Sequence, residues 1–166
     1  NPYESDLANL NENMHRLGLS VKALEDVQQA EKSKTQADVN RAENSINSLF
    51  KEDEEVPQIY NKMIEALEKR LEEIRKILEN EDKIESQIVE LEEMMFNYLN
   101  NKELPSDYDL GIIQDKVNEV GNKTKRDGFQ KRLDAIYAAK NAINAVKLAE
   151  EIIDDSTLKE AEKALN

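Results

Sequence analysis

Apolar residues recur every three or four positions over most of the chain, which is the spacing of one face of an α-helix. The first such stripe predicts a helix over residues 4–31 and consists of Leu7, Leu10, Met14, Leu17, Val21 and Leu24. Gly18 lies inside this segment, but the stripe continues through it and favours an unbroken helix. Stripes of this kind more often belong to the protein's own core than to a partner's surface, so we expect this one to be buried.

A polar segment marks the start of the second predicted helix. Thr35 followed by Asp38 resembles a capping box, in which a hydroxyl accepts a hydrogen bond from a backbone N–H of the first turn. The expected buried face of this helix comprises Val39, Ala42, Ile46, Leu49 and Phe50. The acidic stretch 51–55 and Pro57 end this helix and begin the next.

A third apolar seam begins after Pro57 and changes register across a polar gap at residues 79–83. The pattern allows either one helix of about 45 residues with a stutter, or a turn near Asn80. Because the gap contains neither Gly nor Pro, one long helix is the favoured prediction, and Leu104–Pro105 ends it.

The remainder of the chain predicts three more helices. Ser106 with Asp109 repeats the cap and opens a helix over residues 107–120, which Gly121 then ends. A long helix follows over residues 124–153, with Phe129, Leu133, Ile136, Ile143, Val146 and Ile153 along its apolar face. Thr157 with Glu160 predicts the start of one further helix.

Together these elements predict an all-α protein. The three similar caps indicate helix-pair repeats, which bury their apolar faces only against neighbouring repeats. We therefore expect an elongated helical bundle, or an array of degenerate helix-pair repeats, with one long central helix. The expected division is a helical unit over 1–103 that includes the long acidic helix, a second helix-pair unit over 104–154, and the start of a further helix over 155–166. Because the chain opens without an initiator Met and closes inside a predicted helix, we expect it to be a fragment of a larger protein.

Composition and charge narrow the function classes. The 166 residues include 36 acidic and 23 basic side chains, one His and no Cys, with a formal net charge of −13. Disulfides, thiolate metal sites and multi-histidine metal centres are therefore excluded within this chain. The negative charge argues against general nucleic-acid binding, and no apolar run approaches the length of a membrane-spanning helix.

Two segments resemble a helical repeat found in secreted surface and S-layer-associated proteins of Gram-positive bacteria. The first is Ala30–Val39 with Ala42 and Ile46–Leu49, and the second is Lys125, Phe129 and Arg132–Ile136. The resemblance covers about a third of the chain, and the long acidic helix has no counterpart in it. It implies a spacer or wall-associated stalk on the cell surface or in the cell wall, with no catalytic residues to carry over.

Candidate catalytic and metal-binding chemistry is sparse. Glu12 and His15 form one Glu-x-x-His pair, but a di-iron bundle site needs two such pairs, so we interpret His15 as a surface residue. The clustered carboxylates of the long helix are interpreted as a solvated face. Since no phosphate loop or nucleophile elbow occurs either, we expect no enzyme activity, no cofactor and no metal site.

One local excess of positive charge stands out in this acidic chain, and it comprises Lys123, Lys125, Arg126, Lys131 and Arg132. We call these five residues the basic cluster. They are the predicted binding residues, with an anionic cell-wall polymer as the expected ligand, and the competing interpretation is that they offset neighbouring acids. The favoured function is a non-enzymatic stalk, spacer or cell-wall interaction module. The alternative is an intracellular, cytoplasmic coiled-coil adaptor that binds another protein or a second copy through its apolar seams.

Overall fold

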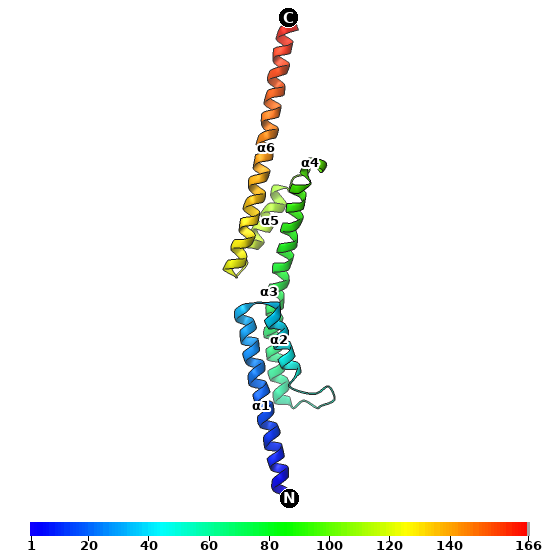
Figure 1. Ribbon diagram of the computed structural model, residues 1–166, viewed down its shortest axis with the longest axis vertical. Coiled ribbons are helices and arrows are strands. Elements are labelled where there is room, and N and C mark those ends of the chain that lie inside the picture. Colours follow the sequence, from blue (N-terminus) through cyan, green and yellow to red (C-terminus); the bar gives the residue numbers. More distant parts are fainter. Residues whose placement is uncertain (166) are drawn as a thin grey trace. The chain divides into compact units, whose positions relative to one another are not determined.

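The computed structural model describes residues 1–165, and Asn166, the last residue of the predicted further helix, lies outside the described part. Regular secondary structure in residues 1–165 is helical throughout, which confirms the all-α prediction. In chain order, the helices are α1 (Pro2–Ser33), α2 (Gln36–Asn47), α3 (Gln58–Phe96), α4 (Tyr98–Asn101), α5 (Asp107–Asn118) and α6 (Lys123–Leu165), as drawn in Figure 1.

Side-chain caps mark the starts of four of these helices, and at α6 the Asn122 side chain accepts a hydrogen bond from the Lys125 N–H at 3.1 Å. The Asn1 side chain accepts a hydrogen bond from the Tyr3 N–H at the start of α1. The Thr35 hydroxyl accepts from the Asp38 N–H at 3.3 Å, and the Ser106 hydroxyl accepts from the Asp109 N–H at 3.0 Å. Each bond satisfies a backbone donor that has no partner within the helix, so both predicted caps of this form are confirmed.

The third predicted cap is wrong. Thr157 lies inside α6, and its hydroxyl donates to the Ile153 carbonyl oxygen four residues earlier. Between Phe129 and Thr157 there is no Gly or Pro and no residue with a left-handed backbone, so the helix continues and the expected new helix over 155–166 does not begin there.

The helix α3 covers Gln58–Phe96 and passes through the polar gap at residues 79–83. Its two halves belong to different compact units, because the chain divides into Asn1–Asn80 (unit 1) and Glu81–Asn166 (unit 2). The sequence pattern placed the boundary between units after residue 103, where one helix ends and the next begins. The boundary between the compact units lies inside α3, because each half of this helix contributes side chains to a separate core.

Unit 1 contains α1, α2 and the first part of α3 around one hydrophobic core. The core residues from α1 and α2 are Ala23, Val27, Ala30, Val39, Ala42 and Ile46, and they pack with Leu49 and with Leu67, Leu71, Ile74 and Leu78 of α3.

Unit 2 forms its own core from the second part of α3, α5 and the first part of α6. These core residues are Ile84, Ile88, Leu91, Leu110, Ile113, Val117, Val120, Phe129, Leu133 and Ile136. Beyond Lys140, α6 carries exposed apolar side chains, so Val146 and Ile153 do not extend the buried face of this helix.

Candidate functional site

The helix α1 presents two faces of different composition. Small residues face the core of unit 1, where Ser20, Ala23 and Ala30 are buried together with Val27. The large apolar residues lie on the other side and are exposed; they are Tyr3, Leu7, Leu10, Met14, Leu17, Val21 and Leu24. We call these seven residues the α1 seam.

The α1 seam is exposed although the sequence pattern predicted a buried stripe. Leu7, Met14 and Leu17 are 61%, 64% and 60% exposed, and every residue from 1 to 15 is exposed. The expectation failed for two reasons. No helix of unit 1 covers residues 1–15, which are exposed on every face, and from Leu17 to Leu24 the core is closed by the small residues Ser20 and Ala23. A contiguous apolar surface of this kind is typical of a site for protein–protein contact.

The spacing of the α1 seam is that of a coiled coil. Its members are separated alternately by four and three residues, so that Leu7, Met14 and Val21 occupy position a of a heptad and the others occupy position d. On an α-helix these positions form a single narrow stripe, into which side chains of a second helix can insert.

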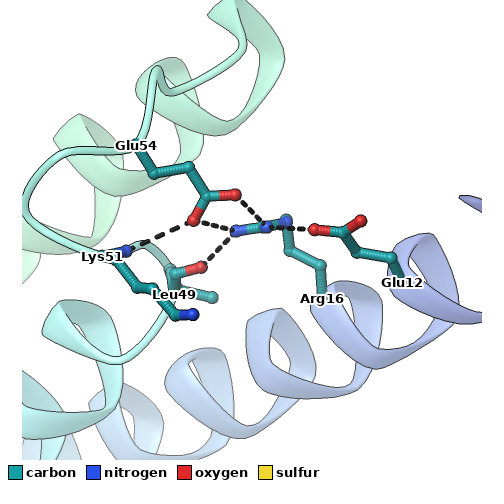
Figure 2. Close-up of polar contacts among 5 residues, drawn as sticks. All are labelled: Glu12, Arg16, Leu49, Lys51 and Glu54. Carbon is teal, nitrogen blue, oxygen red and sulfur yellow. Dashed lines mark hydrogen bonds and ion pairs between the residues drawn. The ribbon is translucent and has the colours of Figure 1, made fainter.

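Arg16 fixes the orientation of α1 in unit 1, as Figure 2 shows. Its guanidinium donates to the Leu49 carbonyl oxygen at 2.6 Å, to the Glu54 carboxylate at 2.6 Å and to Glu12 at 3.2 Å. It also lies 4.1 Å from the centroid of the Phe50 ring. Because Arg16 points away from the α1 seam, these contacts hold the seam toward solvent.

The loop after α2 supplies the acceptors for Arg16. Glu54 accepts hydrogen bonds from the Lys51 backbone N–H and from Arg16, and these bonds lower the pKa of its carboxyl below the ordinary value. Phe50 packs edge-on against Tyr60, with ring centroids 5.4 Å apart. The loop is therefore fixed to both α1 and α3 within unit 1.

The basic cluster does not form one free positive surface. Lys123 pairs with Asp127, and Lys125 pairs with the buried carboxylate of Glu81. Arg126 donates to the Val120 carbonyl oxygen. Lys125 and Arg132 are seven residues apart and share a face of α6 toward α3, whereas the other three cluster residues project in different directions around α6.

Arg132 is the most extensively paired member of the basic cluster. It donates to Glu92 at 2.7 and 2.6 Å and also to Glu85. These hydrogen bonds lower the pKa of the Glu92 carboxyl and raise that of the Arg132 guanidinium. An added anion would have to compete with carboxylates already in place, whereas Lys131 is exposed.

A shallow depression of about 360 Å³ in unit 2 lies beside these ion pairs. Glu81, Glu85, Lys125, Phe129 and Arg132 are among its lining residues. Glu81 is 4% exposed, and its second carboxylate oxygen, Oε1, is buried with no hydrogen-bond partner in the described part of the chain. Because Lys125 pairs with Glu81 and Arg132 pairs with Glu85, the charges that line the depression largely neutralise one another.

The Glu12 and His15 pair is not assembled into a site. Glu12 is directed to Arg16, and His15 is exposed. Across residues 1–165, no three His, Asp or Glu side chains are grouped in a way that could hold a metal ion. Over the same residues, no helix combines the length and the apolar character needed to cross a lipid bilayer.

Comparison with protein-family models, with curated proteins and with solved structures gives no match to this chain.

The sequence pattern identified six of the seven residues of the α1 seam, all except Tyr3, but did not single out the residues that position the seam. Arg16 bonds to acceptors more than 30 positions away in the chain, so no local spacing marks it. The pairing of Lys125 with Glu81 and that of Lys140 with Asp107 also span tens of residues. Such pairs can be predicted only when it is already known which helices lie next to each other.

Proposed function

We propose that the chain is a non-enzymatic helical interaction module that associates with another protein by packing a helix against the α1 seam. The exposure of seven large apolar side chains at heptad spacing supports this proposal. In an isolated helix their contact with water gives no stabilisation, whereas packing against a second helix removes them from water. The proposal depends on the seam alone, so it applies equally to a surface protein and to an intracellular adaptor.

The geometry gives less support to retention of an anionic polymer by the basic cluster. Lys123, Lys125 and Arg132 are already paired with carboxylates, and Arg126 is bonded to a backbone carbonyl. Mutual neutralisation weakens the field that attracts a polyanion. The α1 seam has no comparable internal partner.

A synthetic peptide of four heptads, with leucine at positions a and d, tests whether the α1 seam accepts a helix. We expect saturable binding to the chain, measured by fluorescence anisotropy of the labelled peptide. The double variant Leu10→Glu with Leu17→Glu is expected to weaken binding by at least about tenfold, because it places charges in the centre of the apolar contact.

The matched control is Leu148→Glu with Leu158→Glu on α6, where both leucines are also exposed. This control is expected to bind the peptide as the unmodified chain does. Absence of binding to a chain that is monomeric in solution, or equal binding by the seam variant, would overturn the proposal. Circular dichroism shows whether each variant keeps its helicity.

A further inference from the structure

We infer that the partner of the α1 seam is a second copy of this chain, with the two α1 helices packed antiparallel. This inference rests on the proposed function, because it names the helix that the seam accepts. Three observations support the inference: the distribution of charge along α1, the spacing of the seam and the apolar area that pairing would bury.

Charge is segregated along α1 in a way that favours antiparallel pairing. Residues 1–12 contain three acidic side chains, Glu4, Asp6 and Glu12, and no Lys or Arg. Residues 13–24 contain Arg16 and Lys22 and no Asp or Glu. Arg16 points away from the seam and pairs with Glu12 and Glu54, so Lys22, which also pairs with Asp26, is the basic side chain that remains exposed. Antiparallel packing sets Glu4 and Asp6 of one helix near Lys22 of the other, whereas parallel packing sets Glu4 and Asp6 beside their own counterparts.

Two antiparallel registers each pair six members of the seam, and we infer the one that also brings Glu4 of one copy beside Lys22 of the other. In that register Tyr3 faces Val21 of the second copy, Leu7 faces Leu17 and Leu10 faces Met14, and the two-fold axis repeats each contact. Every layer then joins an a position to a d position, as antiparallel coiled coils require. Leu24, the least exposed member of the seam at 38%, is left outside these layers.

Residues that flank the centre of this register are compatible with self-association. The two-fold axis passes near residue 12, so Asn11 lies beside Asn11 of the second copy, and Asn13 beside its counterpart. An Asn side chain both donates and accepts hydrogen bonds, so two identical amides can pair without charge repulsion. Near the ends, Glu4 of one copy lies beside Lys22 of the other, whose side chain is 61% exposed and pairs with Asp26 of its own helix at 3.1 Å.

The apolar area lies near the lower limit for a specific dimer. Six seam side chains from each copy, which are about half to three-quarters exposed in this structure, would leave water together. At about 30 Å² for each methylene-sized group, they remove on the order of 1,000 Å² from water, which is near the minimum for a specific interface and below the usual size. The exposed part of α6 is a weaker candidate, because its large apolar side chains do not keep the alternation of three and four.

Sedimentation equilibrium of the full chain over a range of concentrations tests the inference. We expect a reversible monomer–dimer equilibrium, with the dissociation constant raised at least about tenfold by Leu10→Glu with Leu17→Glu. The α6 control, Leu148→Glu with Leu158→Glu, is expected to dimerise as the unmodified chain does. A chain that stays monomeric, or a dimer that only the α6 variant disrupts, would overturn the inference.

Disulfide cross-linking tests the orientation, because the chain has no Cys of its own. A mixture of Leu10→Cys and Met14→Cys chains is expected to give a mixed cross-linked dimer faster than Met14→Cys alone. The reverse result indicates parallel helices and overturns the antiparallel arrangement.

Exchange of two charges is a second test of the orientation. Glu4→Lys alone and Lys22→Glu alone are each expected to weaken dimerisation by a factor of a few, and the double variant is expected to restore it.

These outcomes separate the inference from the proposed function. A monomeric chain that still binds the synthetic peptide through the α1 seam overturns the second copy as partner and leaves the interaction module in place. A chain that neither dimerises nor binds the peptide overturns both.

Discussion

Arg16 shows how a single side chain determines which surface of a helix is available. It lies on α1, yet its strongest acceptors are Leu49 and Glu54 in the loop after α2. The side chain is 14% exposed, so its bonds are made partly away from water. Bonds of this kind resist rotation of α1, and rotation would exchange the small buried face for the leucines of the α1 seam.

Replacing Arg16 with Ala is expected to lower the free energy of unfolding of unit 1 by about 1–3 kcal/mol. The cost arises because the Leu49 carbonyl loses its donor and the Phe50 ring loses the guanidinium that covers it. Urea denaturation followed by circular dichroism measures the change. The control is His15→Ala, an exposed neighbour, and an equal loss in both variants would contradict the role assigned to Arg16.

At the scale of the helices, two similar sequence patterns give different structures: a Thr followed three residues later by an acidic residue caps a helix at Thr35 but lies inside a helix at Thr157. Thr35 precedes α2 in an extended conformation, with φ −116° and ψ 145°, and caps that helix. The residue before it, Lys34, is left-handed and ends α1, so the backbone has already left the helix when Thr35 is reached. Nothing comparable precedes Thr157, which lies within α6.

Thr35→Ala is therefore expected to destabilise unit 1 by about 1 kcal/mol, the usual cost of losing an N-cap. Thr157→Ala is expected to have little effect on stability, since alanine has the higher intrinsic helix propensity within a helix. Thermal unfolding monitored at the helical circular dichroism signal distinguishes them. Equal destabilisation by both substitutions would indicate that α6 is interrupted near residue 157.

At the scale of the whole chain, stability is divided between two cores. The core of unit 1 contains no buried residue beyond Leu78, and that of unit 2 begins at Ile84. Leu71 and Leu133 are fully buried, one in each core. Because each core is made by residues of a single unit, the two units are expected to respond separately to loss of a core side chain.

Leu71→Ala and Leu133→Ala are each expected to cost about 2–5 kcal/mol, because each leaves a cavity in a packed core. Native-state hydrogen exchange should show the loss of amide protection mainly in residues 1–80 for the first variant and mainly in residues 81–165 for the second. If either substitution lowers protection equally throughout the chain, the two cores unfold as one cooperative unit.

Local features of the chain were predictable from sequence alone. The helical periodicity, the absence of β-forming patterns and the caps at Thr35 and Ser106 act within one or two turns, so they depend on few other residues. The all-α class and the starts of α2 and α5 therefore follow from the sequence.

Tertiary structure decided which of these local patterns are used. Periodicity identified the apolar stripe of α1, but burial depends on which part and which face of the helix its neighbours cover. Residues 1–15 are not covered on any face, and beyond them Ala23 and Ala30 face the core in place of Leu17 and Leu24. Likewise, the charge of Lys125 and Arg132 was evident from sequence, whereas their partners Glu81 and Glu92 are about 40 positions away. Sequence by itself thus determined where helices form, and only the packing of those helices decided which apolar face and which charges remain available to a partner.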